Sequence, residues 1–245
     1  MIWIIFRLTL KELGGRKRLA LVALLASLPA LVAVAYRLGN QHTNPPQWTA
    51  DVLLDGVVVT ILLPLVALIF GTSALGSEIE DGTIVHLLSK PVSRCEIILA
   101  KLAPAWLLTA LFVVPSAAVS GTIAIWGSAE QGIVIGFLVG SLLGALAYTA
   151  LFVLLSALTS RALFVGLAYV FVWEGIVTQL FSGTRYLSVR QCCLGVADLI
   201  SSAGDKTFSS DLGGVESLLI LATAGVASVV LAVRLLDSFQ VGQSG

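Results

Sequence analysis

The sequence predicts an all-α integral membrane protein with six transmembrane helices and an N-terminal amphipathic helix. Of its 245 residues, 58% are hydrophobic and only 11% carry a charged side chain, with a mean hydropathy of +1.01. Soluble domains carry about 25% charged residues, so this chain has too few to cover a surface in water. The same hydrophobicity excludes intrinsic disorder. The 14 basic residues are balanced by 14 acidic ones, which argues against a nucleic-acid partner.

Six apolar runs with at most two charges each are long enough to cross a lipid bilayer as helices. A helix needs about 20 mostly apolar residues to do so, and these runs lack the two-residue alternation of barrel strands. The expected spans cover about residues 19–37, 54–77, 102–126, 132–159, 162–183 and 216–235. We expect a single transmembrane domain over residues 1–245, with a cytoplasmic segment at 78–98 and an external or re-entrant segment at 185–215.

Residues 2–15 predict an amphipathic helix that lies in the membrane interface. Its apolar side holds Ile2, Trp3, Ile5, Phe6, Leu10 and Leu13. Arg7 and Lys11 fall on the other side, and Gly14-Gly15 permits a turn into the first span. One alternative is a cytoplasmic extension of the first span. Another is a signal peptide, which the long basic region before the apolar run disfavours.

The distribution of basic residues predicts that both termini are cytoplasmic. With that orientation, only four of the 14 Lys and Arg residues lie outside: Arg37, Arg185, Arg190 and Lys206. An excess of basic residues on the cytoplasmic side is the usual rule for membrane proteins. Both ends inside is also consistent with an even number of spans.

Several kinds of enzyme chemistry have no motif in this sequence. There is no G-x-x-x-x-G-K-[ST] phosphate loop, so the chain does not bind ATP by that mechanism. The only histidines, His42 and His86, are expected on opposite sides of the membrane, which disfavours a metal site. No spacing of nucleophile and base predicts catalysis. We therefore expect no catalytic residues, no metal ligands and no cofactor bound by this chain.

The most informative segment is the expected cytoplasmic one, which contains acids, a Gly-Thr pair, a short apolar stretch and a basic end. A short helix with an exposed apolar face at the membrane surface is suited to docking in a groove of a partner protein. The alternative is a solvated loop that packs on its own helix ends. The residues that form the pattern are Glu78, Glu80, Gly82, Thr83, Leu87, Leu88, Pro91, Ser93 and Arg94.

This pattern, E-x-E-x-G-T followed by L-L and P-x-S-R, resembles the signature of ABC-2-type permeases, which have the type V exporter architecture. These are membrane subunits of bacterial and archaeal ATP-binding-cassette exporters. The amphipathic start resembles the elbow helix of that family, and Tyr169–Gly175 resembles its fifth-span pattern. The resemblance covers nearly the whole chain.

The resemblance implies a transport subunit without its own ATPase site. It would pair with a second permease chain, usually as a homodimer in the lipid bilayer of the cell (inner) membrane. Two copies of a cytosolic ATPase, carrying ATP and Mg, would dock on residues 78–98. The substrate path would lie at the dimer interface, and the chain after the fifth span would fold back at the outer side. The apolar spans favour export of a hydrophobic or amphiphilic substrate.

Glu174 is the one titratable residue expected deep within the spans, beside Trp173. A charge at membrane depth is costly, so it faces protein or water. These two residues could contact substrate or gate its path. Alternatively, the carboxylate is hydrogen-bonded to neighbouring helices near the outer end. The competing function is an ion-gradient-driven secondary transporter that uses Glu174; a membrane scaffold or membrane-embedded enzyme is a third possibility.

Overall fold

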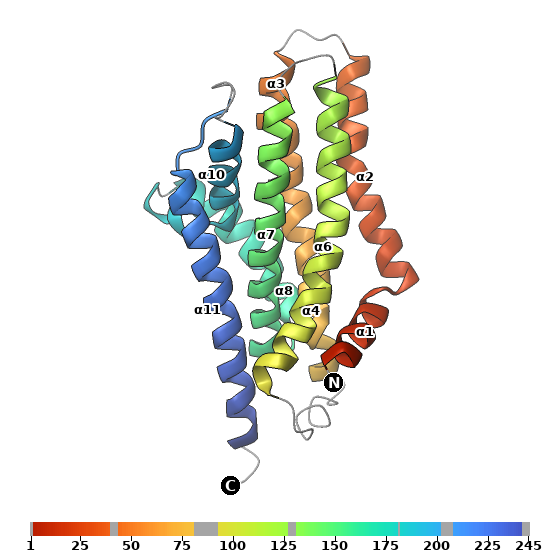
Figure 1. The fold of residues 1–245 in the computed structure, drawn as a ribbon, viewed down its shortest axis with the longest axis vertical. Coiled ribbons are helices and arrows are strands. Elements are labelled where there is room, and N and C mark those ends of the chain that lie inside the picture. The colour runs from red at the N-terminus through yellow and green to blue at the C-terminus, as the bar shows by residue number, and fades with distance from the viewer. Residues whose placement is uncertain are drawn as a thin grey trace.

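The computed structural model describes residues 2–39, 44–80, 93–126, 131–180, 182–201 and 208–241. Within these ranges all regular secondary structure is helical, which confirms the all-α class. The long helices stand side by side in a bundle (Figure 1). The N-terminal helix and the last turns of the C-terminal helix lie at the same end of the bundle, called here the terminal end. The opposite end is the distal end.

Five helical stretches are long and apolar enough to cross a membrane, so the chain is a multi-pass membrane protein. The first is α2 (Arg16–Leu38), and the second combines α3 (Pro45–Trp48), η1 (Thr49–Leu62) and α4 (Leu63–Glu80). The others are α6 (Arg94–Ala124), α7 (Gln131–Leu158) and α11 (Gly214–Val241).

The second span begins before the expected residue 54, because the prolines start the helix. Pro45 and Pro46 occupy its first turn, where a backbone N–H would have no partner within the helix and a proline costs nothing. The Thr49 hydroxyl then donates to the Pro45 carbonyl at 2.7 Å. The following segment, η1, is a π-helix, and the Leu63 backbone N–H at its end donates to the Val58 carbonyl five residues earlier.

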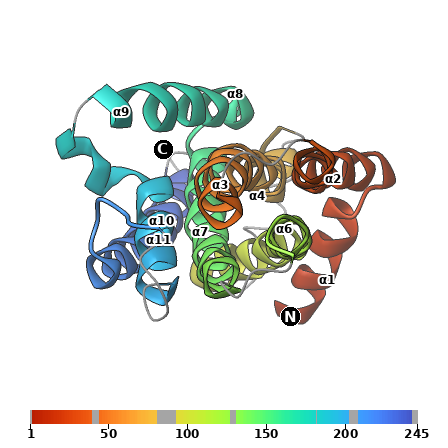
Figure 2. The same cartoon turned by 90° about the horizontal axis from the view of Figure 1, so that it is seen from above.

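The expected fifth span at 162–183 is a shorter helical stretch over residues 162–180, of which Ala162–Val177 is the apolar helix. It comprises α8 (Ala162–Ala168), the π-helix η2 (Tyr169–Val177) and α9 (Thr178–Leu180). Viewed from above, α8 and α9 form a row along one edge of the bundle (Figure 2). A 3₁₀-helix, η3 (Ser182–Leu187), then leads into α10 (Val189–Ser201), which lies beside α7 in the distal half (Figure 1).

The predicted N-terminal amphipathic helix is α1 (Ile2–Leu13). Leu13 is fully buried, whereas Trp3 is 72% exposed and stacks on Phe6 with ring centroids 5.5 Å apart. The chain turns at Gly14-Gly15, between α1 and α2, so that α1 points away from the axis of α2. At the terminal end α1 packs against α6 and α4 (Figure 1). It therefore covers the two helix ends that flank residues 81–92.

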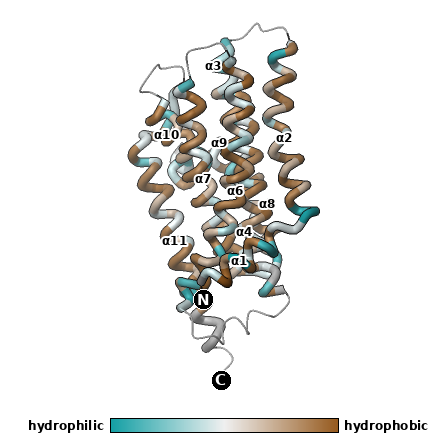
Figure 3. The backbone as a smooth tube through the Cα atoms, turned by 45° about the vertical axis from the view of Figure 1, so that its right-hand side comes forward, coloured by the Kyte–Doolittle hydropathy of each residue, from teal (hydrophilic) through white to brown (hydrophobic). Residues whose placement is uncertain are grey.

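The core is centred on α7, which packs against α4, α6, α10 and α11. Its fully buried aromatic residues include Tyr148 and Phe152. By contrast, only 17% of the most apolar window of α2 or α11 is buried, against 56% for α6 and α7. Figure 3 shows hydrophobic residues along most of α2 and α11. These two peripheral helices therefore present apolar faces to lipid or to another chain.

Glycines at every fourth position of α7 allow α10 to approach its backbone. A Cβ atom at Gly140 would lie 2.6 Å from the Cys193 carbonyl oxygen, and one at Gly136 would collide with the Ala197 carbonyl. Gly144 faces the Cys193 sulfur in the same way. Such small-residue ladders are the usual basis of close helix packing in membranes. Here the ladder serves packing within the chain.

Gly140→Ala is expected to destabilise the protein, and Gly132→Ala in the same helix is the control. The added methyl at 140 must displace the α10 backbone, at a cost of about 1–3 kcal/mol. At Gly132 the nearest atom would be 4.0 Å away. Thermal unfolding in detergent should show a midpoint several degrees lower for Gly140→Ala alone. Equal midpoints for both variants would contradict this packing.

Candidate functional site

At the terminal end, a buried ion pair joins the end of α4 to the start of α6. Lys101 is only 2% exposed, and its Nζ lies 2.5 Å from Oε1 of Glu78. A buried charge is tolerated in a protein when it is paired. The pair therefore fixes the two helix ends between which residues 81–92 run. Lys101 was not among the predicted site residues; its position in an otherwise apolar run was the available signal.

Two residues of the predicted coupling motif form the start of α6. Ser93 is the N-cap, and its Oγ accepts a hydrogen bond from the Glu96 backbone N–H at 3.3 Å. Arg94 is the first helical residue. Serine at the N-cap with glutamate three residues later is the sequence pattern of a capping box. Helix α6 therefore begins within the expected 78–98 segment, well before residue 102.

The remaining motif residues are described only in part. Glu80 is the last residue of α4. The others lie outside the described residues: Gly82, Thr83, Leu87, Leu88 and Pro91.

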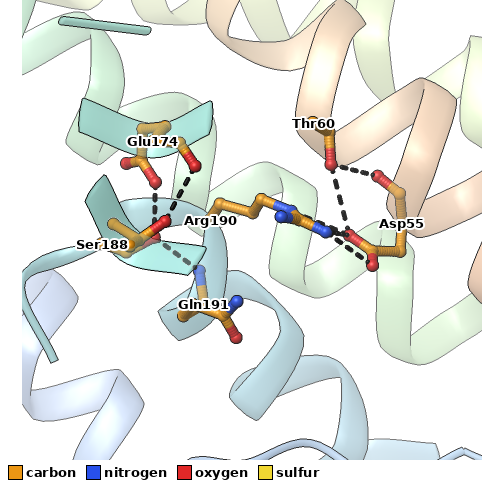
Figure 4. Close-up of polar contacts among 7 residues, drawn as sticks. Asp55, Thr60, Glu174, Ser188, Arg190 and Gln191 are labelled. Atoms are coloured by element: carbon orange, nitrogen blue, oxygen red, sulfur yellow. Dashed lines mark hydrogen bonds and ion pairs between the residues drawn. The ribbon is translucent and has the colours of Figure 1, made fainter. Parts of the chain in front are cut away.

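About midway along the bundle, Glu174 is 4% exposed and accepts hydrogen bonds from four donors. The phenol groups of Tyr148 and Tyr169 donate to Oε1 at 3.1 and 3.3 Å. The backbone N–H of Val189 donates to the same oxygen at 3.0 Å, and the Ser188 hydroxyl donates to Oε2 (Figure 4). The carboxylate is thus held by α7, by its own helix and by the start of α10.

These contacts place a carboxylate at the N-terminus of α10. Backbone N–H groups at a helix start lack partners within the helix and favour a negative charge. Ser188 supplies a second cap, because its Oγ also accepts from the Gln191 N–H at 3.1 Å (Figure 4). Trp173 contributes a weaker contact, from Nε1 to the Leu187 carbonyl at 3.4 Å. Glu174 is thus hydrogen-bonded to neighbouring helices, and a contact of Glu174 or Trp173 with substrate stays a prediction.

A second carboxylate anchors α10 from the other side. Arg190 donates from Nε and Nη2 to Oδ1 of Asp55 at 3.1 and 2.9 Å, and from Nη2 to Oδ2 at 2.9 Å (Figure 4). Both side chains are mostly buried, at 14% and 17% exposed. Asp55 lies in η1 and Glu174 in η2, so each anchoring acid comes from a π-helical segment. Such segments occur frequently at functional sites.

A groove of about 440 Å³ runs between α6, α7 and α11. Every lining residue is Leu, Ala, Val or Gly; Leu102, Leu146, Leu221 and Val229 represent the three walls. It is suited to hydrocarbon and offers no side-chain hydrogen bond. Within the ranges that the structure describes, no group of three His, Cys, Asp or Glu side chains is placed to hold a metal ion.

Comparison with known proteins identifies the class. Residues 11–202 match the family model described as ABC-2 family transporter protein. The match includes the Glu78–Lys101 pair and the anchors of α10, and the chain belongs to this family. It is a membrane permease subunit of an ABC-type transporter. No curated protein matches the sequence significantly.

Glu174→Ala is expected to loosen α10. The substitution leaves four donors without an acceptor, and each unsatisfied buried group costs about 1–3 kcal/mol. Cys192 and Cys193 are 0% and 1% exposed, so maleimide labelling of these thiols reports detachment of α10. In a Cys95→Ser background, labelling should become at least about tenfold faster, since this corresponds to about 1.4 kcal/mol.

Trp173→Phe is the matched control, because it removes only one long hydrogen bond from the neighbouring position. Its labelling rate should equal that of the Cys95→Ser background. An unchanged rate in Glu174→Ala would show that the carboxylate does not hold α10.

The Asp55–Arg190 pair is expected to contribute measurably to stability. A double-mutant cycle with Asp55→Asn and Arg190→Gln should give a coupling energy of about 1.5–3 kcal/mol, as for hydrogen bonds to charged groups. The Arg185–Asp211 pair, at 34% and 62% exposed, is the control. Its coupling should stay below about 1 kcal/mol, because solvent screens it. Equal couplings for the two pairs would contradict the anchoring role of Asp55.

Proposed function

We propose that this chain is the transmembrane subunit of an ABC exporter, coupling ATP hydrolysis by a separate cytosolic ATPase to export of a hydrophobic or amphiphilic substrate. The family match over residues 11–202 carries this proposal. ATP and Mg would reside on the ATPase, of which two copies would serve a homodimer of the permease.

Residues 78–98 would be the docking segment for the ATPase. In support, α1 packs against both α4 and α6, the helices that precede and follow residues 81–92. The Glu78–Lys101 pair joins the two helices that enter and leave it. A displacement of the segment would therefore move α4 and α6 together rather than separate them. Both helices pack on α7, which would carry the movement to α10 at the distal end.

The peripheral helices support a homodimer within the bilayer. The faces of α2 and α11 are largely exposed and apolar; Leu24 and Val226 are 68% and 64% exposed. The apolar groove lies beside α11. A second chain against this region would place the groove at or near the dimer interface, where hydrocarbon could be bound. This supports a hydrophobic or amphiphilic substrate.

The proposed orientation places the terminal end in the cytoplasm of a cell with a bacterial or archaeal inner membrane. Basic residues gather in the segments that meet at this end: Arg16, Lys17, Arg18, Arg94, Lys101, Arg161 and Arg234. The positive-inside rule favours that side as cytoplasmic.

The gradient-driven alternative receives no support from the geometry. A proton-coupled carboxylate needs a route to water, whereas Glu174 is 4% exposed and accepts bonds from four donors. Its contacts are those of a group that holds two helices together.

Copurification tests the proposed function. The tagged chain, extracted gently from its native membrane, should bring down a soluble protein with a phosphate loop in a fixed ratio. Arg94→Ala should reduce recovery of this partner severalfold. Arg185→Ala, at the distal end, should leave recovery unchanged. A folded chain that transports substrate without any nucleotide-binding partner would overturn the proposal.

Glu78→Ala needs a second variant, because it leaves the buried Lys101 ammonium unpaired. Breaking a buried pair costs about 3–5 kcal/mol. The double variant Glu78→Ala/Lys101→Met should restore the unfolding midpoint. If the ATPase fails to copurify only with Glu78→Ala, the loss reflects impaired folding. If it fails to copurify with the double variant as well, Glu78 belongs to the docking surface.

A further inference from the structure

A polar pocket of about 250 Å³ at the terminal end is lined by two arginines and, among the residues that the structure describes, by no acidic one. It lies between the first turn of α2, the last turns of α4 and the turn that joins α7 to α8. Arg18 and Arg161 supply its positive charge, and Thr72, Ser73 and Ser160 supply hydroxyl groups. This pocket is separate from the Glu78–Lys101 pair and from the apolar groove.

One nitrogen of the Arg18 guanidinium lacks a hydrogen-bond acceptor in the described part of the chain. This nitrogen, Nη1, is buried. A buried donor on a charged group that finds no acceptor costs more than a neutral one. The Thr72 and Ser73 hydroxyls donate to the Leu68 and Ile69 carbonyls at 2.6 and 2.7 Å, and their oxygens carry no negative charge to balance the arginine.

Two arginines that line one cavity favour an anion with several oxygen atoms. Planar guanidinium groups bind phosphate through paired hydrogen bonds. The cavity has room for such a group, because Gly76 forms part of its wall and a Cβ there would meet no atom within 4 Å. The chemistry of the pocket therefore fits a phosphate.

The surroundings of the pocket favour a phosphate that carries hydrocarbon chains. Gly76 is the last residue of the apolar second span, and Arg18 lies in the first turn of the apolar α2. At the rim, Phe164 and Leu163 are 73% and 45% exposed. A cationic pocket beside exposed apolar side chains, at the end of the apolar spans, matches the boundary between headgroups and acyl chains.

We propose that the Arg18–Arg161 pocket binds the phosphate of an anionic membrane lipid, whose acyl chains pass over Leu163 and Phe164. The bound lipid joins α2 and α4 to the turn before α8. It stabilises the end of the bundle without forming part of the apolar groove. This assignment requires only that the chain is a membrane protein, so it stands or falls independently of the ATPase partner.

The test is a titration of the delipidated full chain in neutral detergent with phosphatidylglycerol, following the unfolding midpoint. Phosphatidylglycerol should raise the midpoint saturably, and phosphatidylcholine should raise it less. Arg18→Gln and Arg161→Gln should each weaken the apparent affinity by about 10-fold or more, since each removes charged hydrogen bonds. Gly76→Leu should weaken it as well, because it fills the pocket without changing charge.

Lys17→Gln is the matched control, as it removes a neighbouring cation that does not line the pocket. It should keep the full response. An equal loss in Lys17→Gln and Arg18→Gln would overturn the proposal, because it would indicate general attraction of anionic lipid. Inorganic phosphate that reproduces the whole shift would overturn the lipid assignment. Unchanged lipid affinity in both arginine variants, with reduced ATPase recovery, would assign the pocket to the partner protein instead.

Discussion

The arrangement of the distal half depends on the satisfaction of two carboxylates away from water. Glu174 accepts hydrogen bonds from four donors, and Asp55 binds Arg190 through both of its carboxylate oxygens. Because some of these donors belong to α10, the bonds that offset the desolvation of each acid also hold α10 in place. In hydrocarbon an unsatisfied polar group is far more costly than in water. A carboxylate that is buried away from water must find hydrogen-bond donors in fixed places. Because α10 supplies some of these donors, only one position of α10 satisfies both acids. Apolar packing alone would leave α10 free to slide along α7.

Glycine packing and polar anchoring act on the same helix. The α7 ladder brings the α10 backbone close enough for many dispersion contacts, which are the main attraction between helices in lipid. The anchors then select one register among the several that a smooth glycine surface allows. Both anchoring acids lie in π-helical segments, where the hydrogen bonding departs from the regular α pattern. The irregular stretches of spans two and five are therefore the parts that position α10.

At the terminal end the buried charged groups are basic rather than acidic, and they too need partners away from water. Lys101 is buried and paired with Glu78, whereas Nη1 of Arg18 is buried and has no hydrogen-bond partner within the described ranges. The first arrangement closes the two helix ends beside the proposed docking segment. The second leaves a positive pocket that a phosphate completes. Between the two ends stands α7, in contact with the helices of both sites. A displacement at the terminal end thus has a packed route to α10.

The sequence by itself determined the membrane class, the approximate spans, the N-terminal amphipathic helix and the family pattern, because hydropathy and short motifs are properties of neighbouring residues. It did not determine that the prolines at 45 and 46 begin a helix, nor that the fifth span is short and partly π-helical. It also did not determine the partners of Asp55 and Lys101. Asp55 and Arg190 are 135 positions apart, and such pairs form only when packing brings two helices together. Tertiary structure alone therefore decided that Glu174 holds α10 and that the α7 glycines face it.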